Sequence, residues 1–254
     1  MKKYTSLLFV SGIILFSLFL GCEKDNEDAD ENKQGNNLNV GVSANSFLSD
    51  DYYDRLTVEV LYMSDYEPTE NAVNNLLSFL NNYLNKPDEI EIIVEQIPAQ
   101  GKNSYSVDDL TDIESEYRTR YNTNTNIAAS LIVLDGEYSE NNQVLGVAYR
   151  NTSMAIFGST IAENSGGISQ PSRSKLESAI MNHEFGHLLG LVDLGTEMVD
   201  NHEDPDHGKH CDNSDCLMYY AVETTEIASF LMESDVPDLD QNCKNDLILN
   251  GGKQ

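Results

Sequence analysis

The sequence predicts an α/β domain, of the α+β type, in which helices pack on a mixed β-sheet. Three observations support this class. Strand-like and helix-like apolar patterns alternate from residue 55 onward, one strand-like segment is continuously apolar, and capping signals precede the helix-like segments. We expect one domain over residues 52–254, because a segment of this length suits a single hydrophobic core.

The first half of this domain alternates between the two patterns. Alternating apolar residues predict half-buried strands, a continuous apolar run predicts a central strand covered on both faces, and apolar residues spaced three and four apart predict helices. Pro68-Thr69 and a capping box from Ser106 to Asp109 start the first two helices. The predicted strands are 55–63, 90–94, 127–134, 144–149 and 153–157.

A third helix carries the side chains that could perform chemistry. We expect the capping box Ser174-x-x-Glu177 to open it and Gly190 to end it. His183 and His187 are four residues apart and therefore face the same side of the helix. Zinc accepts two imidazoles in this arrangement. Glu184 stands between them, where it can take a proton from metal-activated water and pass it to a leaving amine.

The distribution of histidine supports a metal site. The chain has five histidines, all between positions 183 and 210, at His183, His187, His202, His207 and His210. Neither core packing nor a solvent-exposed helix face predicts this clustering. Gly190 lets the chain turn sharply after the helix, so that a third ligand can return to the same ion. The sequence therefore predicts a zinc site that includes His183 and His187.

Two segments carry a family resemblance. His183-Glu184-x-x-His187-x-x-Gly190 resembles the metzincin signature, and His210-Cys211-x-x-x-x-Cys216-x-Met218 is similar to the archaemetzincin pattern. The resemblance implies a metzincin-like fold with an active-site helix and a Met-turn at Met218. It also implies a zinc-dependent endopeptidase that hydrolyses peptide bonds in proteins by metal-activated water. Its zinc ligands would be His183, His187 and His210, and Glu184 would be the general base and acid.

Tyr220 follows the Met-turn by two positions. In astacin-like and serralysin-like metzincins, a tyrosine at this position reaches the metal or the developing oxyanion. The resemblance therefore implies a catalytic role for Tyr220, with packing in the core as the alternative.

The third zinc ligand is left open by an insertion at residues 192–209, where archaemetzincins are much shorter. The spacing after Gly190 leads to Asp193, whereas the pairing with Cys211 leads to His210, which we favour because zinc binds imidazole readily. His202 is the third alternative. The insertion is rich in carboxylates that could bind calcium, but a solvated flap over the cleft is the simpler interpretation.

The cysteines depart from the family pattern. Archaemetzincins resemble a two-zinc design with four cysteines, whereas this domain contains only Cys211, Cys216 and Cys243. We therefore expect a disulfide between two of them. A zinc site of the three thiolates and His207 is the alternative.

The N-terminal sequence predicts that the protein is located in the cell envelope. Met1-Lys2-Lys3, the apolar run 7–20 and Gly21-Cys22 resemble a lipoprotein signal peptide, with residues 1–21 removed and Cys22 lipidated. Residues 22–51 would form an acidic, disordered tether. We expect an outer-membrane lipoprotein similar to those of Bacteroidetes-type bacteria. The acidic residues after Cys22 are either a surface-export signal or a simple spacer.

Composition and charge limit the classes of partner that the protein can bind. The chain has 15 Lys and Arg against 43 Asp and Glu, a formal net charge of −28, which repels nucleic acid and anionic surfaces. We expect a monomer that binds a protein or peptide substrate along an edge strand at Met154–Phe157. The alternative function is a non-catalytic surface lipoprotein with a structural zinc. Glu184 argues against that alternative, because a structural site needs no base.

Overall fold

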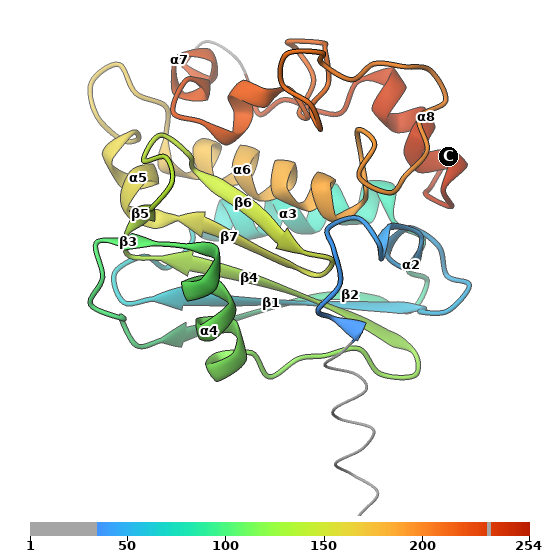
Figure 1. Ribbon diagram of the computed structural model, residues 1–254, viewed down its shortest axis with the longest axis horizontal. Coiled ribbons are helices and arrows are strands. Elements are labelled where there is room, and N and C mark those ends of the chain that lie inside the picture. The colour runs from blue at the N-terminus through green and yellow to red at the C-terminus, as the bar shows by residue number, and fades with distance from the viewer. Residues whose placement is uncertain (1–34, 233–234) are drawn as a thin grey trace, which may run out of the picture.

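A five-stranded mixed sheet forms the centre of the computed structural model, which describes residues 35–232 and 235–254 (Figure 1). Only the outermost pair, β6 and β7, is antiparallel, and the other neighbours are parallel. The predicted fold class is confirmed. In spatial order the strands are β2 (Glu89–Ile97), β1 (Arg55–Met63), β4 (Asn126–Leu134), β7 (Ser153–Phe157) and β6 (Gly146–Arg150).

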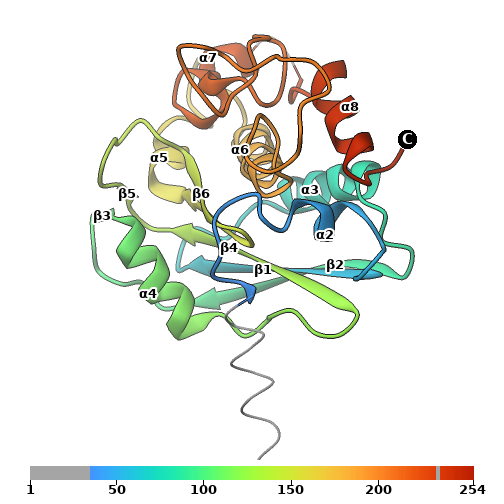
Figure 2. The same cartoon turned by 45° about the vertical axis from the view of Figure 1, so that its right-hand side comes forward.

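Helices cover both faces of this sheet (Figures 1 and 2). Helices α3 (Glu70–Tyr83) and α6 (Arg173–Leu188) lie side by side on one face, and α4 (Val107–Tyr117) lies on the other. Each face has its own core, because successive side chains of a strand point to opposite sides. In β1, Val60 packs in the core under α3 and α6, whereas Leu61 packs in the core under α4.

The remaining elements are short. Strands β3 (Ser104–Tyr105) and β5 (Glu137–Tyr138) form a small parallel pair, and α5 (Gly158–Glu163) follows β7. The last part of the chain, orange to red in Figure 1, lies over α6 on the side away from the sheet. Among the described residues, no helix has both the length and the apolar character needed to cross a membrane. The helices of this last part are η1 (Tyr220–Glu223), α7 (Ile227–Leu231) and α8 (Gln241–Leu249).

One helix cap differs from the prediction. The capping box at Ser106 is present, with Ser106 and Asp109 bonded reciprocally. In α6, however, the cap is Ser172, whose hydroxyl accepts from the Lys175 amide at 3.3 Å, so the predicted box at Ser174 is wrong. Glu177 points elsewhere and joins α6 to the start of α3.

The buried carboxylate of Glu177 accepts three hydrogen bonds at the junction of α6 with α3. Glu177 accepts from the Arg173 guanidinium at 2.7 Å, and from the amide and hydroxyl of Thr69 at 2.9 and 2.7 Å. Thr69 is the N-cap of α3. The two helices that cover one face of the sheet are thus joined at their N-terminal ends.

The packed domain begins earlier in the chain than residue 52. Asn36 donates to the Thr152 hydroxyl at 2.9 Å, and Asn151 donates to the Ser43 hydroxyl at 2.7 Å, which holds this segment to the β6–β7 turn. Phe47, in α2 (Ala44–Leu48), is fully buried. The prediction of a disordered tether is therefore wrong for residues 36–51. The predicted signal peptide, Cys22 and the first part of the tether lie outside the described residues.

The edge of the sheet is also different from the prediction. Strand β7, which contains Met154–Phe157, lies between β4 and β6 and has a hydrogen-bonded neighbour on each side. The hairpin places β6 on the outside instead. The predicted edge strand is therefore wrong, and the edges of the sheet are β2 and β6.

Candidate metal centre

The end of α6 positions the first two candidate ligands and turns the chain away. The amide of Gly190 donates to the His187 carbonyl at 3.0 Å, and the amide of Leu191 donates to the Gly186 carbonyl at 3.2 Å. These two bonds form a Schellman cap, in which Gly190 has a left-handed φ of 74°. The predicted end of the helix is confirmed.

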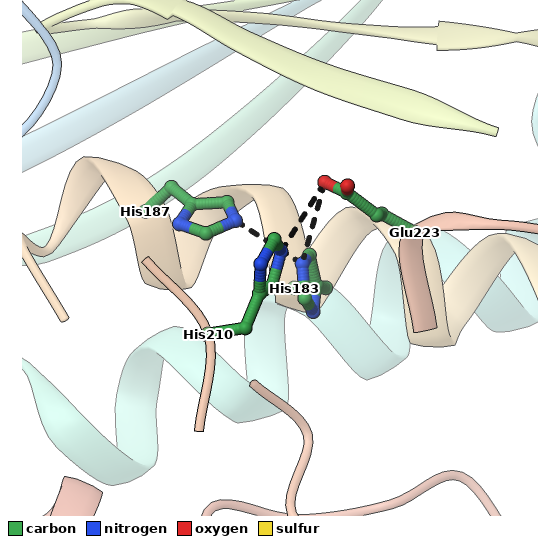
Figure 3. Close-up of side chains that lie close together, drawn as sticks. All are labelled: His183, His187, His210 and Glu223. Atoms are coloured by element: carbon green, nitrogen blue, oxygen red, sulfur yellow. Dashed lines mark hydrogen bonds and ion pairs between the residues drawn. The ribbon is translucent and has the colours of Figure 1, made fainter. Parts of the chain in front are cut away.

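Three imidazoles converge beside this helix end (Figure 3). Nδ1 of His183 donates to the Leu217 carbonyl at 2.7 Å, and Nδ1 of His210 donates to the His207 carbonyl at 3.3 Å. These bonds leave Nε2 of both rings free to face the third imidazole. Nε2 of His187 lies 3.1 Å from Nε2 of His183. The structure thus brings together the three histidines predicted as zinc ligands.

A carboxylate that the sequence analysis missed completes this group. Oε2 of Glu223 lies 3.4 Å from Nε2 of His210 and 3.9 Å from Nε2 of His183 (Figure 3). The potential ligand atoms of His183, His187, His210 and Glu223 all lie within 4.8 Å of one another. We call these four residues the histidine group.

The electrostatics of the group suit a cation. Burial is the main cause that lowers the pKa of His183 to about 4 and lowers the pKa of His187 well below its ordinary value. Both rings are therefore neutral near pH 7, as metal ligands must be. Nδ1 of His187 and Nε2 of His210 are buried without a hydrogen-bond partner. Convergent neutral imidazoles with an unpartnered nitrogen fit a zinc ion well.

Glu184 lies beside the group without belonging to it. Its side chain is fully buried, and neither carboxylate oxygen has a hydrogen-bond partner. Burial, and then the charge of Glu223, raise the pKa of Glu184 well above its ordinary value. Strand β6 passes very close to the Glu184 carboxylate at Gly146. A Cβ on Gly146 would lie 2.8 Å from Oε1 of Glu184, so a larger residue would not fit.

A cleft of about 250 Å³ gives access to these side chains. Its walls come from the N-terminal segment, the edge strand β6 and the insertion, so segments distant in sequence enclose it. The insertion therefore contributes to the cleft, in agreement with a flap, although the acidic side chains of its described residues form no group of three or more that could hold an ion. The lining residues are Val40, Val147, Ala148, Glu184, His187, Leu194, Lys209, His210 and Glu223.

The other candidates lie outside the group. Asp193 is exposed and has a left-handed φ of 64°. His202 is buried in a different place, where Nε2 bonds to Asp246 at 2.7 Å. The ring of Tyr220 stacks on His207 at a centroid distance of 3.6 Å, and Tyr220 does not line the cleft. The structure therefore brings only His210, of the three alternatives, to His183 and His187.

Met218, the residue predicted to form the Met-turn, packs on α6. Its side chain is fully buried. A Cβ on Gly186 would lie 2.3 Å from its sulfur, so Met218 packs directly on α6 between the levels of His183 and His187.

The three cysteines form a second group with Asp240. All three are free and buried, so the expected disulfide is wrong. Their sulfurs and a carboxylate oxygen of Asp240 lie within 4.8 Å of one another. The amides of Met218 and Asp240 donate to the sulfur of Cys216 at 3.4 and 3.3 Å, which stabilises a thiolate. Asp240 takes the place given to His207 in the sequence-based alternative.

Comparison with known proteins supports the fold. Neither the known family models nor the curated proteins contain a match to this sequence. The structure is similar to archaemetzincin from Methanopyrus kandleri, with a TM-score of 0.51 and 15% identity, over 78% of this chain and 96% of that chain. Metalloproteinase-II from Bacteroides fragilis aligns with a TM-score of 0.43 and 14% identity, over 80% of this chain and 54% of that chain. The chain therefore has an archaemetzincin-like fold.

Proposed function

We propose that this protein is a zinc-dependent endopeptidase. The observation that carries the proposal is the convergence of His183, His187 and His210 beside the unpartnered carboxylate of Glu184, inside an open cleft. Chance histidines would not share a buried and convergent arrangement. The archaemetzincin-like fold supports the same class of enzyme.

Each residue of the site has a separate task. His183, His187 and His210 would hold zinc through Nε2. The carbonyls of Leu217 and His207 fix the orientation of two of these rings, as partners of metal-bound histidines commonly do. When bound, zinc polarises a carbonyl group and makes a water more acidic.

Glu184 would move the proton. Its raised pKa makes the carboxylate a stronger base than an ordinary glutamate, so it can accept a proton near neutral pH. Because the residue lies in the wall of the cleft, the same oxygen can then return the proton to the amine that leaves. The other carboxylate in the cleft wall is Glu223. Its side chain is partly exposed and lies 3.4 Å from His210, whereas both oxygens of Glu184 are buried without a partner.

The substrate would bind as an extended strand. Strand β6 is an edge of the sheet, and its residues Val147 and Ala148 line the cleft. An exposed edge offers backbone donors and acceptors to any extended peptide, with little selection by sequence. A protein or peptide substrate is therefore the class that this cleft suits.

Replacement of Glu184 by Gln tests the proposal. The amide keeps the shape of the side chain but cannot accept the proton, so peptide hydrolysis should fall by a factor on the order of a hundred or more. Zinc content should stay equal to that of the parent, and Glu163→Gln, an exposed carboxylate away from the cleft, is the matched control. Casein hydrolysis by Glu184→Gln at the parental rate would refute the catalytic role of Glu184.

A second candidate is a non-catalytic protein with structural zinc. The presence of Glu223 in the histidine group favours it, because structural zinc sites have four protein ligands and catalytic sites keep one position open. The two functions differ in one measurement. A zinc-loaded parent that cleaves no casein or peptide library would support the structural role.

Two further features belong to the proposal. The cysteine group, with Asp240 as its fourth donor, would hold a second, structural zinc. The N-terminal sequence would anchor the protein to the outer membrane through lipid on Cys22. Cys22→Ala should move the protein from the membrane fraction to the soluble fraction, and its persistence in the membrane would point to an uncleaved anchor.

A further inference from the structure

The donor atoms of the histidine group have the separations of a complete tetrahedral shell. Zinc bonds of about 2.0–2.1 Å place the corners of a tetrahedron about 3.3 Å apart. Nε2 of His183 lies 3.1 Å from Nε2 of His187 and 3.9 Å from Oε2 of Glu223, and the same Glu223 oxygen lies 3.4 Å from Nε2 of His210. Glu223 therefore stands where a fourth ligand would stand.

The position of Glu223 is fixed by its backbone. Its carbonyl accepts from the Leu145 amide at 2.8 Å, and the amide of Thr225 donates to the Gln143 carbonyl at 2.9 Å. The preceding residue, Val222, is buried in the core. These contacts join the end of η1 to the segment before β6, so the Glu223 side chain is directed into the cleft by the fold.

The hydrogen bonds of two rings leave their outer nitrogens directed towards Glu223. Because a carbonyl only accepts, Nδ1 of His183 and of His210 must carry a proton. Nε2 is then the atom of each ring that remains to bind a metal, and Nε2 of His210 is buried without a hydrogen-bond partner. Oε2 of Glu223 lies 3.4 Å from this nitrogen, so one cation could bind both atoms.

We propose that Glu223 is a fourth protein ligand that caps the metal and must leave it before a peptide can bind. The inference rests on the proposed function, because it assigns the fourth position of that same zinc site. Glu223 is the one member of the histidine group with an appreciably exposed side chain, at 28%, and the adjacent cleft gives it space to move. The resting protein is thus closed by its own carboxylate.

Three measurements on the full mature chain test this proposal, with Glu223→Gln as the variant. The amide is a poor zinc ligand, so zinc affinity in competition with a chelator should fall about tenfold or more. The visible spectrum of the cobalt-loaded protein should change, because it reports the number and type of donors. Acetohydroxamate, a small zinc-binding probe, should bind about tenfold more tightly because the fourth position is free.

Two further variants keep the result interpretable. Glu226→Gln removes the same charge from an exposed position three residues along and should match the parent in all three measurements. Glu223→Asp shortens the side chain and should resemble Glu223→Gln if loss of contact with the metal is the cause. It also replaces Glu223→Gln if that variant fails to fold.

The possible failures are distinct. Unchanged zinc affinity, cobalt spectrum and acetohydroxamate affinity in Glu223→Gln would overturn the capping role, while casein hydrolysis by the parent would leave the proposed function standing. A parent that binds no zinc would overturn both.

Discussion

Gly186→Ala tests the contact between α6 and Met218. Gly186 lies within the helix, one residue before His187. A Cβ there would lie 2.3 Å from the sulfur of Met218 and 3.1 Å from its terminal methyl carbon. Met218 is fully buried, so its side chain has little room to withdraw.

Two opposing effects set the size of the change. Alanine is favoured over glycine inside a helix by about 1 kcal/mol. Overpacking a buried site costs about 1–3 kcal/mol, and a contact of 2.3 Å belongs in the upper part of that range. We therefore expect Gly186→Ala to lower the free energy of unfolding by about 1–2 kcal/mol.

Urea unfolding of the metal-free protein measures this change without a contribution from zinc binding. The same substitution is also made in a Met218→Ala variant, which lacks the sulfur that the new Cβ would contact. In that background Gly186→Ala should stabilise the protein by about 0.5–1 kcal/mol, which reverses the sign of its effect. Stabilisation of the parent itself by Gly186→Ala, or the same effect in both backgrounds, would refute the contact between Gly186 and Met218.

The third zinc ligand, the N-terminal segment and the cap of α4 can each be tested by substitution. His210→Ala should reduce zinc retention after dialysis against a mild chelator by at least tenfold, whereas Asp193→Ala should retain zinc like the parent, and the reverse order would make Asp193 the ligand. Lys86 donates to the carbonyls of Ser46, Ser49 and Tyr53, so Lys86→Met should cost about 2–4 kcal/mol in urea unfolding, and a change below the experimental error would show that these bonds do not hold the N-terminal segment. The bond from Lys102, and then the Ser106 amide, lower the pKa of Asp109 from 3.8 to about 2. Because the folded pKa is the lower one, the stability that Asp109 contributes is present above pH 4 and is lost as the pH falls towards 2. Asp109→Asn should lose that part of the acid dependence of the urea midpoint, and an unchanged pH profile would contradict the assignment.

Local patterns in the sequence were sufficient for most of the framework. The apolar pattern of β1, the continuous run in β4 and the glycine at the end of α6 each reflect a local physical requirement, and each element is confirmed. The alternation in β1 nevertheless predicts a half-buried strand, whereas β1 is buried on both faces because helices cover the sheet on both sides. His210 could be reached only through the family resemblance, because the insertion hides its relation to Gly190. The structure brings it to the helix, since a longer loop adds little to the cost of closure.

The missed features depend on tertiary contacts. Glu223 has no spacing relation to the histidines, and the backbone bonds that join its segment to the segment before β6 direct it into the cleft. Residues 36–51 have no regular apolar period, yet Phe47 is buried against Phe185, with ring centroids 5.4 Å apart. The sequence also does not determine which of β6 and β7 lies next to β4, because either strand of a hairpin can pair with it. The cap at Ser172 was missed because Ser174 has a glutamate at the expected spacing, and that glutamate bonds to another helix.

The order of the elements along the chain has a consequence for biosynthesis. Every strand of the central sheet precedes residue 158, whereas the first histidine donor is residue 183 and Glu223 comes later still. In Figure 1 the sheet runs from blue to yellow, and the segments that follow α6 are orange and red. A nascent chain emerges with its N-terminus first. The five strands are therefore all made before any donor of the histidine group, and α6, which completes the core on one face of the sheet, brings the first two donors. Small zinc domains that are unfolded without their ion work in the opposite way. Here the ion would be received by a scaffold that is already built.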